Sequence, residues 1–136
     1  MSQHHATCVV ITDKGVLIRG PSGSGKSDLA LRLIEAGARL VADDYVELSA
    51  RDGEVWATAP DTIKNKMEVR GVGVISRPAV DQARLEVVLD LSESTAIDRL
   101  PDAKFSVLEG IAIRTYSIYP FEASAIAKIK VILDCL

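Results

Sequence analysis

Val16–Ser27, V-L-I-R-G-P-S-G-S-G-K-S, is the stretch that decides the fold of this chain. Its first three residues are apolar and mostly β-branched, which predicts a strand. The pattern G-x-x-x-x-G-K-[ST], whose backbone N–H groups surround phosphate oxygens, is then completed by Gly20, Gly25, Lys26 and Ser27. A helical pattern over Asp28–Ala36 follows, so the N-terminus of that helix points its free N–H groups at the anion. This order of strand, loop and helix predicts a phosphate-binding loop.

Size and charge limit the other classes of function. A chain of 136 residues forms one domain, over residues 1–136, and has no room for an independent substrate domain. A net charge of −3 with scattered basic residues argues against a nucleic-acid or membrane-surface partner. The sequence has no apolar run of membrane-spanning length and no signal-peptide pattern at its start, so we expect a cytoplasmic protein. Cys8 and Cys135 are expected to be buried free thiols.

The segments next to the phosphate loop predict a mixed sheet. Ala6–Thr12 and Val16–Arg19 are predicted to form a β-hairpin closed by a short turn at Asp13-Lys14-Gly15. The strand before the loop is therefore one arm of an antiparallel pair, which differs from an ordinary doubly wound fold. After the helix, Gly37 is predicted to be its left-handed cap, and Arg39–Ala42 the next strand.

The rest of the chain alternates strands with glycine- and proline-containing segments. Lys64–Ser76 is predicted to be an irregular loop that leads into a short strand, and Ser94–Leu100 a helical turn. The predicted strands are Val46–Leu48, Val55–Thr58, Leu85–Leu91 and Ile111–Ile118, with a closing helix at Glu122–Leu136.

Acidic side chains are available for phosphoryl transfer. A loop with Lys26 and Ser27 binds a nucleoside triphosphate with Mg²⁺, and adjacent Asp43 and Asp44 end a strand one helix later. One carboxylate can support the metal while the other takes a proton from an acceptor hydroxyl. A solvated turn or a helix cap is the alternative for this pair. Glu68 is a second metal candidate and Arg70 an internal arginine finger, with a plain surface loop as the alternative for both.

Three segments together resemble the catalytic domain of the HPr kinase/phosphorylase family. They are Gly20–Ser27, Arg39–Asp44 and the segment M-E-V-R-G-V-G-V-I at Met67–Ile75, which is similar to the family signature L-E-I-R-G-L-G-I-I. The implied fold is an α/β, P-loop nucleotide-binding core of the HPr kinase and phosphoenolpyruvate carboxykinase type, a mixed sheet with antiparallel hairpins and flanking helices. The implied activity is ATP-dependent phosphorylation of a serine on HPr, the small phosphocarrier of the bacterial phosphotransferase system, or on its nitrogen-system paralogue.

The resemblance also assigns roles to individual residues. His5 matches the family histidine, Lys26 the phosphate-binding lysine, and Asp44 the proton acceptor supported by Asp43. Ser27 and Glu68 match the Mg²⁺ ligands, and Arg99, within Asp98-Arg99-Leu100, matches the catalytic arginine and outranks Arg70. The implied nucleotide-binding loop consists of Gly20, Pro21, Ser22, Gly23, Ser24, Gly25, Lys26 and Ser27.

Two departures from the family pattern affect the expected activity. Family members usually carry a further N-terminal domain, and a loop resembling P-V-x-x-G-R-N that serves the reverse reaction. This chain has Tyr119–Ser124 at that place, with neither arginine nor glycine. We therefore expect a short, kinase-type member without support for phosphorolysis. Family members are often hexamers, so we also expect a homo-oligomer. Regulator proteins of the phosphotransferase or two-component systems are further expected partners.

Two other classes of function stay open from the sequence. One is a P-loop kinase of a small metabolite, which would need an arginine-rich lid that the sequence does not contain. The other is a non-catalytic ATP sensor, which would bind nucleotide without transferring phosphate to HPr.

Overall fold

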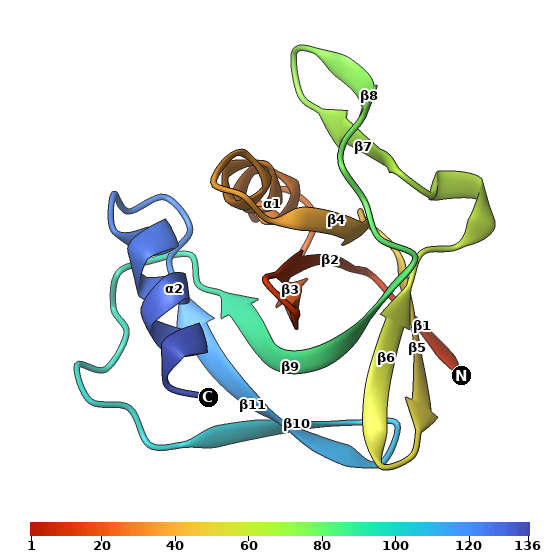
Figure 1. Ribbon diagram of the computed structural model, residues 1–136. Coiled ribbons are helices and arrows are strands. Elements are labelled where there is room, and N and C mark those ends of the chain that lie inside the picture. The colour runs from red at the N-terminus through yellow and green to blue at the C-terminus, as the bar shows by residue number, and fades with distance from the viewer.

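The computed structural model describes residues 1–136 as a strongly curved mixed sheet with two α-helices (Figure 1). The strands are β1 (Ser2–His4), β2 (Ala6–Ile11), β3 (Lys14–Arg19), β4 (Arg39–Ala42), β5 (Val46–Arg51), β6 (Glu54–Thr58), β7 (Lys66–Val69), β8 (Gly73–Ser76), β9 (Gln82–Leu91), β10 (Lys104–Leu108) and β11 (Ile111–Ile118). The helices are α1 (Lys26–Glu35), the short 3₁₀ helix η1 (Asp61–Ile63) and α2 (Ala125–Asp134).

The long strand β9 connects the parts of the sheet. The strand order is β1-β5-β6-β9-β3-β2-β4, and β11, with β10 at its edge, also pairs with β9. The first residues of β9 pair antiparallel with β6, and its second half lies parallel to both β3 and β11. Figure 1 shows β9 bending across the middle of the molecule between these partners. The predicted α/β fold with a mixed sheet and antiparallel hairpins is confirmed.

The hairpin before the phosphate loop is confirmed, although its turn differs from the prediction. β2 and β3 pair antiparallel from Ala6↔Arg19 to Ile11↔Lys14, so the turn is at Thr12-Asp13, where Thr12 has φ 60°. Gly15 is part of β3. A Cβ at this position would lie 2.5 Å from the backbone oxygen of Arg84 on β9. The glycine therefore permits close approach of two strand backbones and does not form the turn.

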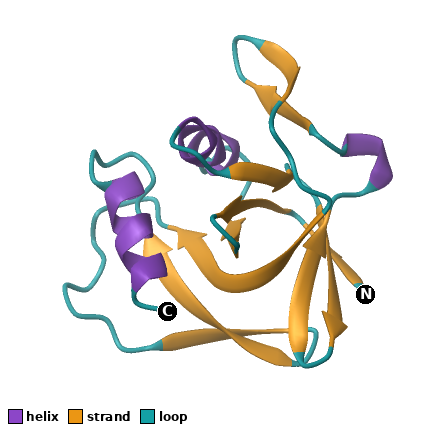
Figure 2. Ribbon diagram, in the orientation of Figure 1, coloured by secondary structure: helices purple, strands orange, loops and turns teal.

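Both helices pack against the same face of the sheet (Figure 2). Leu29, Leu33 and Ile34 of α1 and Ile129 of α2 share one core with the inward side chains of β2, β3 and β9. Gly37 has φ 112° and ends α1 as predicted. A second apolar core lies on the other face, where β5, β6, β10 and β11 curl around it. The phosphate loop is thus fixed between a buried strand and a buried helix.

Two predicted segments are wrong in type. Lys64–Ser76 is mainly a two-stranded hairpin, β7–β8, that projects from the body (Figure 1). Gly71 adopts positive φ in its turn, and Gly73, also at positive φ, begins β8, so these glycines allow the hairpin instead of ending the strands. Ser94–Leu100 contains no helix, since serine side chains there hydrogen-bond to nearby backbone groups and compete with a helical turn. The edge strand β10 was not predicted.

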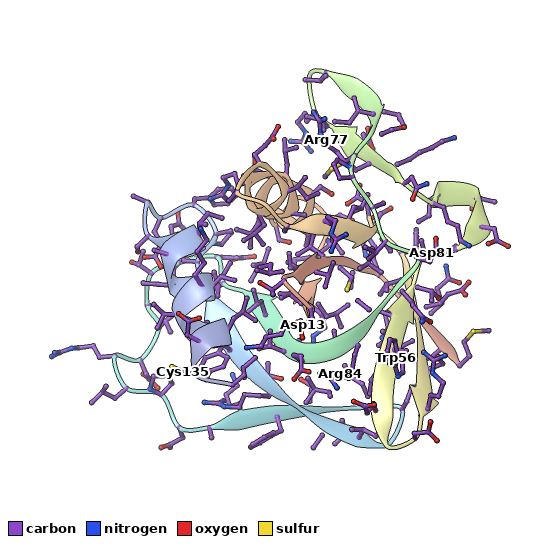
Figure 3. The ribbon with its side chains drawn as sticks, in the orientation of Figure 1. Asp13, Trp56, Arg77, Asp81, Arg84 and Cys135 are labelled. Carbon is purple, nitrogen blue, oxygen red and sulfur yellow. The ribbon has the colours of Figure 1, made fainter.

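The two cysteines differ in environment. Cys8 is fully buried in β2, and burial raises the pKa of its thiol to about 12. Cys135 is exposed at the end of α2 (Figure 3), so the prediction that it is buried is wrong. Its place one residue after the helix leaves it outside the core. Neither α-helix reaches the length and apolarity that crossing a bilayer requires.

Candidate active site

A cavity of about 440 Å³ opens over the N-terminus of α1. Its walls come from four parts of the chain: the phosphate loop, the turn after β4, the β7–β8 hairpin and the segment between β11 and α2. Segments far apart in the sequence therefore meet at the positive end of one helix dipole. Such a place favours binding of an anion.

The phosphate loop has the backbone that its glycines require. Gly25 has φ 100° directly before α1, and a Cβ on Gly20 would lie 2.5 Å from the Ser24 hydroxyl. Lys26 is only 6% exposed, and its ammonium donates hydrogen bonds to the carbonyl oxygens of Gly20 (2.7 Å) and Pro21 (3.2 Å). The lysine is thus held within the curve of the loop, at the position where it can meet a bound phosphate.

Asp43 is a buried acceptor that joins several elements. Its Oδ1 accepts hydrogen bonds from the Ser27 hydroxyl (2.6 Å) and the Thr7 hydroxyl (3.2 Å), and its Oδ2 accepts one from the Glu68 backbone N–H (3.2 Å). These bonds connect β4 to α1, β2 and β7. Asp43 therefore positions Ser27 of the phosphate loop and the hairpin that carries Glu68.

Asp44 points to a different neighbour although it is adjacent in sequence. Its φ of 71° is a left-handed conformation, which aspartate tolerates better than most residues. Its Oδ1 lies 2.7 Å from Nε2 of His5, whose ring is 5.3 Å from that of Tyr45. The Asp44 side chain is 58% exposed and lines the cavity, so it can be reached by a second substrate while His5 holds it in place.

The hairpin supplies the other charged groups of the cavity. Glu68 and Arg70 both line it, and the Glu68 carboxylate makes no hydrogen bond or ion pair. No group of three or more His, Cys, Asp and Glu is arranged to hold a metal on protein ligands alone. The oxygen donors of Ser27, Asp43 and Glu68 instead suit Mg²⁺, which keeps several waters and takes further ligands from substrate phosphates.

Residues 1–131 match the model of the HPr Serine kinase C-terminal domain family. The chain belongs to this family. The HPr kinase/phosphorylase of Limosilactobacillus reuteri (strain DSM 20016) is 38% identical over 126 residues, which is 84% of this chain and 39% of that protein. The enzyme of the same name from Streptococcus thermophilus (strain ATCC BAA-491 / LMD-9) is 36% identical over 121 residues, 80% of this chain and 39% of its own length. The chain thus spans about two fifths of these relatives.

The fold is also that of a solved member of the HPr kinase family. The structure of the Hpr(Ser) kinase/phosphatase from Coxiella burnetii superposes with a TM-score of 0.87 at 25% sequence identity. The match covers 99% of this chain and 95% of that chain. The family and the fold predicted from the three sequence segments are both confirmed.

Most residues predicted for the HPr kinase site lie together. Five of them line the cavity: Lys26, Ser27, Asp43, Asp44 and Glu68. Ser22, Gly23 and Gly25 line it too, whereas Gly20, Pro21 and Ser24 shape the loop from behind. His5 reaches the cavity through Asp44. The exposed Arg99 is not part of the cavity wall, while Arg70 is, so the catalytic role of Arg99 stays a prediction.

Two residues of the site were missed from the sequence. Thr7 donates to Asp43 and accepts from the Asp44 backbone N–H at 3.2 Å, so it fixes both aspartates, but nothing in the run A-T-C-V-V marks it. Phe121 lines the cavity from the segment between β11 and α2. The sequence prediction for that segment concerned only its lack of arginine and glycine.

Proposed function

We propose that this chain transfers the γ-phosphoryl group of ATP to a serine of an HPr-type phosphocarrier protein, and that it is a kinase without the reverse, phosphorolytic activity. The observation that carries the proposal is the meeting of Lys26, Ser27 and the Asp43-Asp44 pair in one cavity. The absence of arginine and glycine from Tyr119–Ser124 supports the restriction to the forward reaction.

Asp44 is the proton acceptor in this proposal. The oxygen of the acceptor serine forms a bond to the γ-phosphorus while the bond from that phosphorus to its bridging oxygen breaks, so ADP leaves with the electron pair. The proton of the serine hydroxyl passes to the free carboxylate oxygen of Asp44. The hydrogen bond from His5 at 2.7 Å orients this carboxylate, and its exposure leaves it within reach of a protein substrate.

The remaining charged groups manage the phosphates. Lys26 and the N-terminal N–H groups of α1 bind the triphosphate. Ser27 and Glu68 would hold Mg²⁺, with Asp43 accepting from the Ser27 hydroxyl and so orienting its oxygen. When bound, Mg²⁺ neutralises charge that develops on the phosphate oxygens. Arg99 is proposed to stabilise the same charge.

Exposed apolar side chains near the cavity support a protein as the second substrate. Tyr45 follows Asp44 directly and is 44% exposed. On the projecting hairpin, Val74 is the strand partner of Glu68, and Val72 precedes it in the turn; both are about 70% exposed (Val72 72%, Val74 70%). Exposed apolar groups that gather beside a polar site are typical of a surface that docks another protein.

The test is transfer from labelled MgATP to purified HPr and to its nitrogen-system paralogue, with the modified residue located by mass spectrometry. We expect phosphate on one serine of at least one carrier, and none in the Lys26→Ala variant. A panel of sugars and hydroxy acids is assayed in parallel. Transfer to one of these small molecules, with no transfer to either carrier, would replace the proposal by a metabolite kinase.

A further inference from the structure

Phe121 has an unusual position for an aromatic side chain. It is 59% exposed, yet it lies at the wall of the cavity over α1. Its ring atoms Cζ and Cε1 are 2.9 and 3.2 Å from the place where a Cβ on Gly25 would be. Burial of a phenylalanine side chain stabilises a folded protein. The ring of Phe121 is mostly exposed and contributes little in this way, while its edge contacts the phosphate loop.

The segment that carries the ring is firmly attached to both helices. The carbonyl oxygen of the buried Pro120 accepts a hydrogen bond from Arg32 of α1 at 2.5 Å. Glu122 pairs with Lys128 of α2 at 2.5 Å. Tyr119 meets the Phe121 ring edge to face, with centroids 5.8 Å apart. The contacts of Pro120 and Glu122 and the ring of Tyr119 therefore position Phe121 at the cavity.

The cavity wall combines carboxylates with a few apolar side chains. The β7–β8 hairpin and α2 lie on opposite sides of α1 in Figure 1. The cavity takes Glu68 from that hairpin and Phe121 from the segment before α2. Asp43, Asp44 and Glu68 supply its carboxylates, and the transferred phosphoryl group must lie near Asp44 if Asp44 is the base. The apolar side chains in the lining are Leu31, Val69 and Phe121, and of these only Phe121 comes from the segment between β11 and α2. A nucleotide whose phosphates occupy the loop must place its base against another part of the cavity wall, and Phe121 is the aromatic side chain in that wall.

We propose that Phe121 is the stacking surface for the base of the bound nucleotide, an inference that rests on the proposed use of ATP. Aromatic rings stack on the faces of all nucleobases, and stacking alone does not distinguish one base from another. The site should therefore bind ATP and GTP with dissociation constants within about tenfold of each other.

The experiment measures dissociation constants of the whole chain for MgATP, MgGTP and inorganic triphosphate by calorimetry. Phe121→Ala should weaken ATP and GTP by about 5- to 100-fold and leave triphosphate within about twofold, because triphosphate has no base to stack. Phe121→Trp should retain tight nucleotide binding. The matched control is Phe105→Ala, since Phe105 is the other phenylalanine of the chain, is 61% exposed and lies on β10 outside the cavity. This control should bind all three ligands like the wild type.

Three results would overturn the inference alone. One is unchanged ATP affinity in Phe121→Ala. Another is an equal loss of affinity for ATP and triphosphate, which would make Phe121 a support for the phosphate loop. The third is a loss of ATP affinity in Phe105→Ala as large as in Phe121→Ala. If the wild type bound no nucleotide at all, the proposed function would fail with it. Thermal unfolding of each variant checks that the exposed substitutions leave the fold intact.

Discussion

The two adjacent aspartates are predicted to have separable roles, one in stability and one in chemistry. Asp43 accepts three hydrogen bonds, from the Ser27 hydroxyl, the Thr7 hydroxyl and the Glu68 N–H. A hydrogen bond to a charged acceptor contributes about 1.5–3 kcal/mol, and bonds to one carboxylate are not additive. Asp43→Ala leaves three donors without their acceptor, so the free energy of unfolding should fall by about 3–5 kcal/mol.

Asp44→Asn is the matched substitution at the neighbouring position. Asp44 is more than half exposed and pairs only with His5, so its stability loss should stay below about 1 kcal/mol. Its rate of phosphoryl transfer should fall by about 10²- to 10⁴-fold, equivalent to about 2.7–5.5 kcal/mol of transition-state stabilisation. Urea unfolding and single-turnover transfer measure the two effects separately. Equal stability losses in the two variants, or full turnover in Asp44→Asn, would refute the division of roles.

Three further outcomes follow from single positions. Burial raises the pKa of Cys8 from 9.0 to about 12, so the unfolding free energy should fall as pH rises from about 9 to 12, and urea titrations of Cys8→Ala should show a shallower fall. Gly15→Ala should cost about 1–3 kcal/mol in the same assay, since its Cβ would meet the Arg84 carbonyl; an unchanged midpoint would contradict the close approach of β3 and β9. Arg99→Ala should lower the rate of phosphoryl transfer and leave nucleotide affinity unchanged. A normal rate in Arg99→Ala, together with a lowered rate in Arg70→Ala, would assign the role to Arg70, which lines the cavity.

Local sequence predicted the parts of the site that depend on neighbouring residues. The strand, glycine loop and helix of Val16–Ala36 follow from periodicity and turn chemistry, and so does the end of β4 at Ala42, directly before Asp43. The β7–β8 hairpin was missed because Gly71 and Gly73 resemble strand breakers in the sequence. In the structure Gly71 lies in the turn and Gly73 begins β8, both with positive φ. The pairing of β7 with β8 cannot be read from glycine positions alone.

Contacts between distant residues could not be predicted in this way. Thr7 meets Asp43 across 36 positions, and its selection depends on the pairing of β2 with β4. Phe121 reaches Gly25 only because β11 lies parallel to β9 and returns the chain to the phosphate loop. The sequence predicts Gly15 in a turn, because its close neighbour in the structure, Arg84, is on a strand that follows much later. Each of these depends on sheet topology, which periodicity does not determine.

The central claim is that the phosphate loop and the acidic pair act on the same phosphoryl group. The most direct measurement is a crystal structure of this chain with Mg²⁺ and a non-hydrolysable ATP analogue. The account predicts phosphates over Gly25–Ser27, with the terminal phosphate facing Asp44 and leaving room between them for a serine hydroxyl. A terminal phosphate that pointed away from Asp44, or a nucleotide bound outside this cavity, would contradict it.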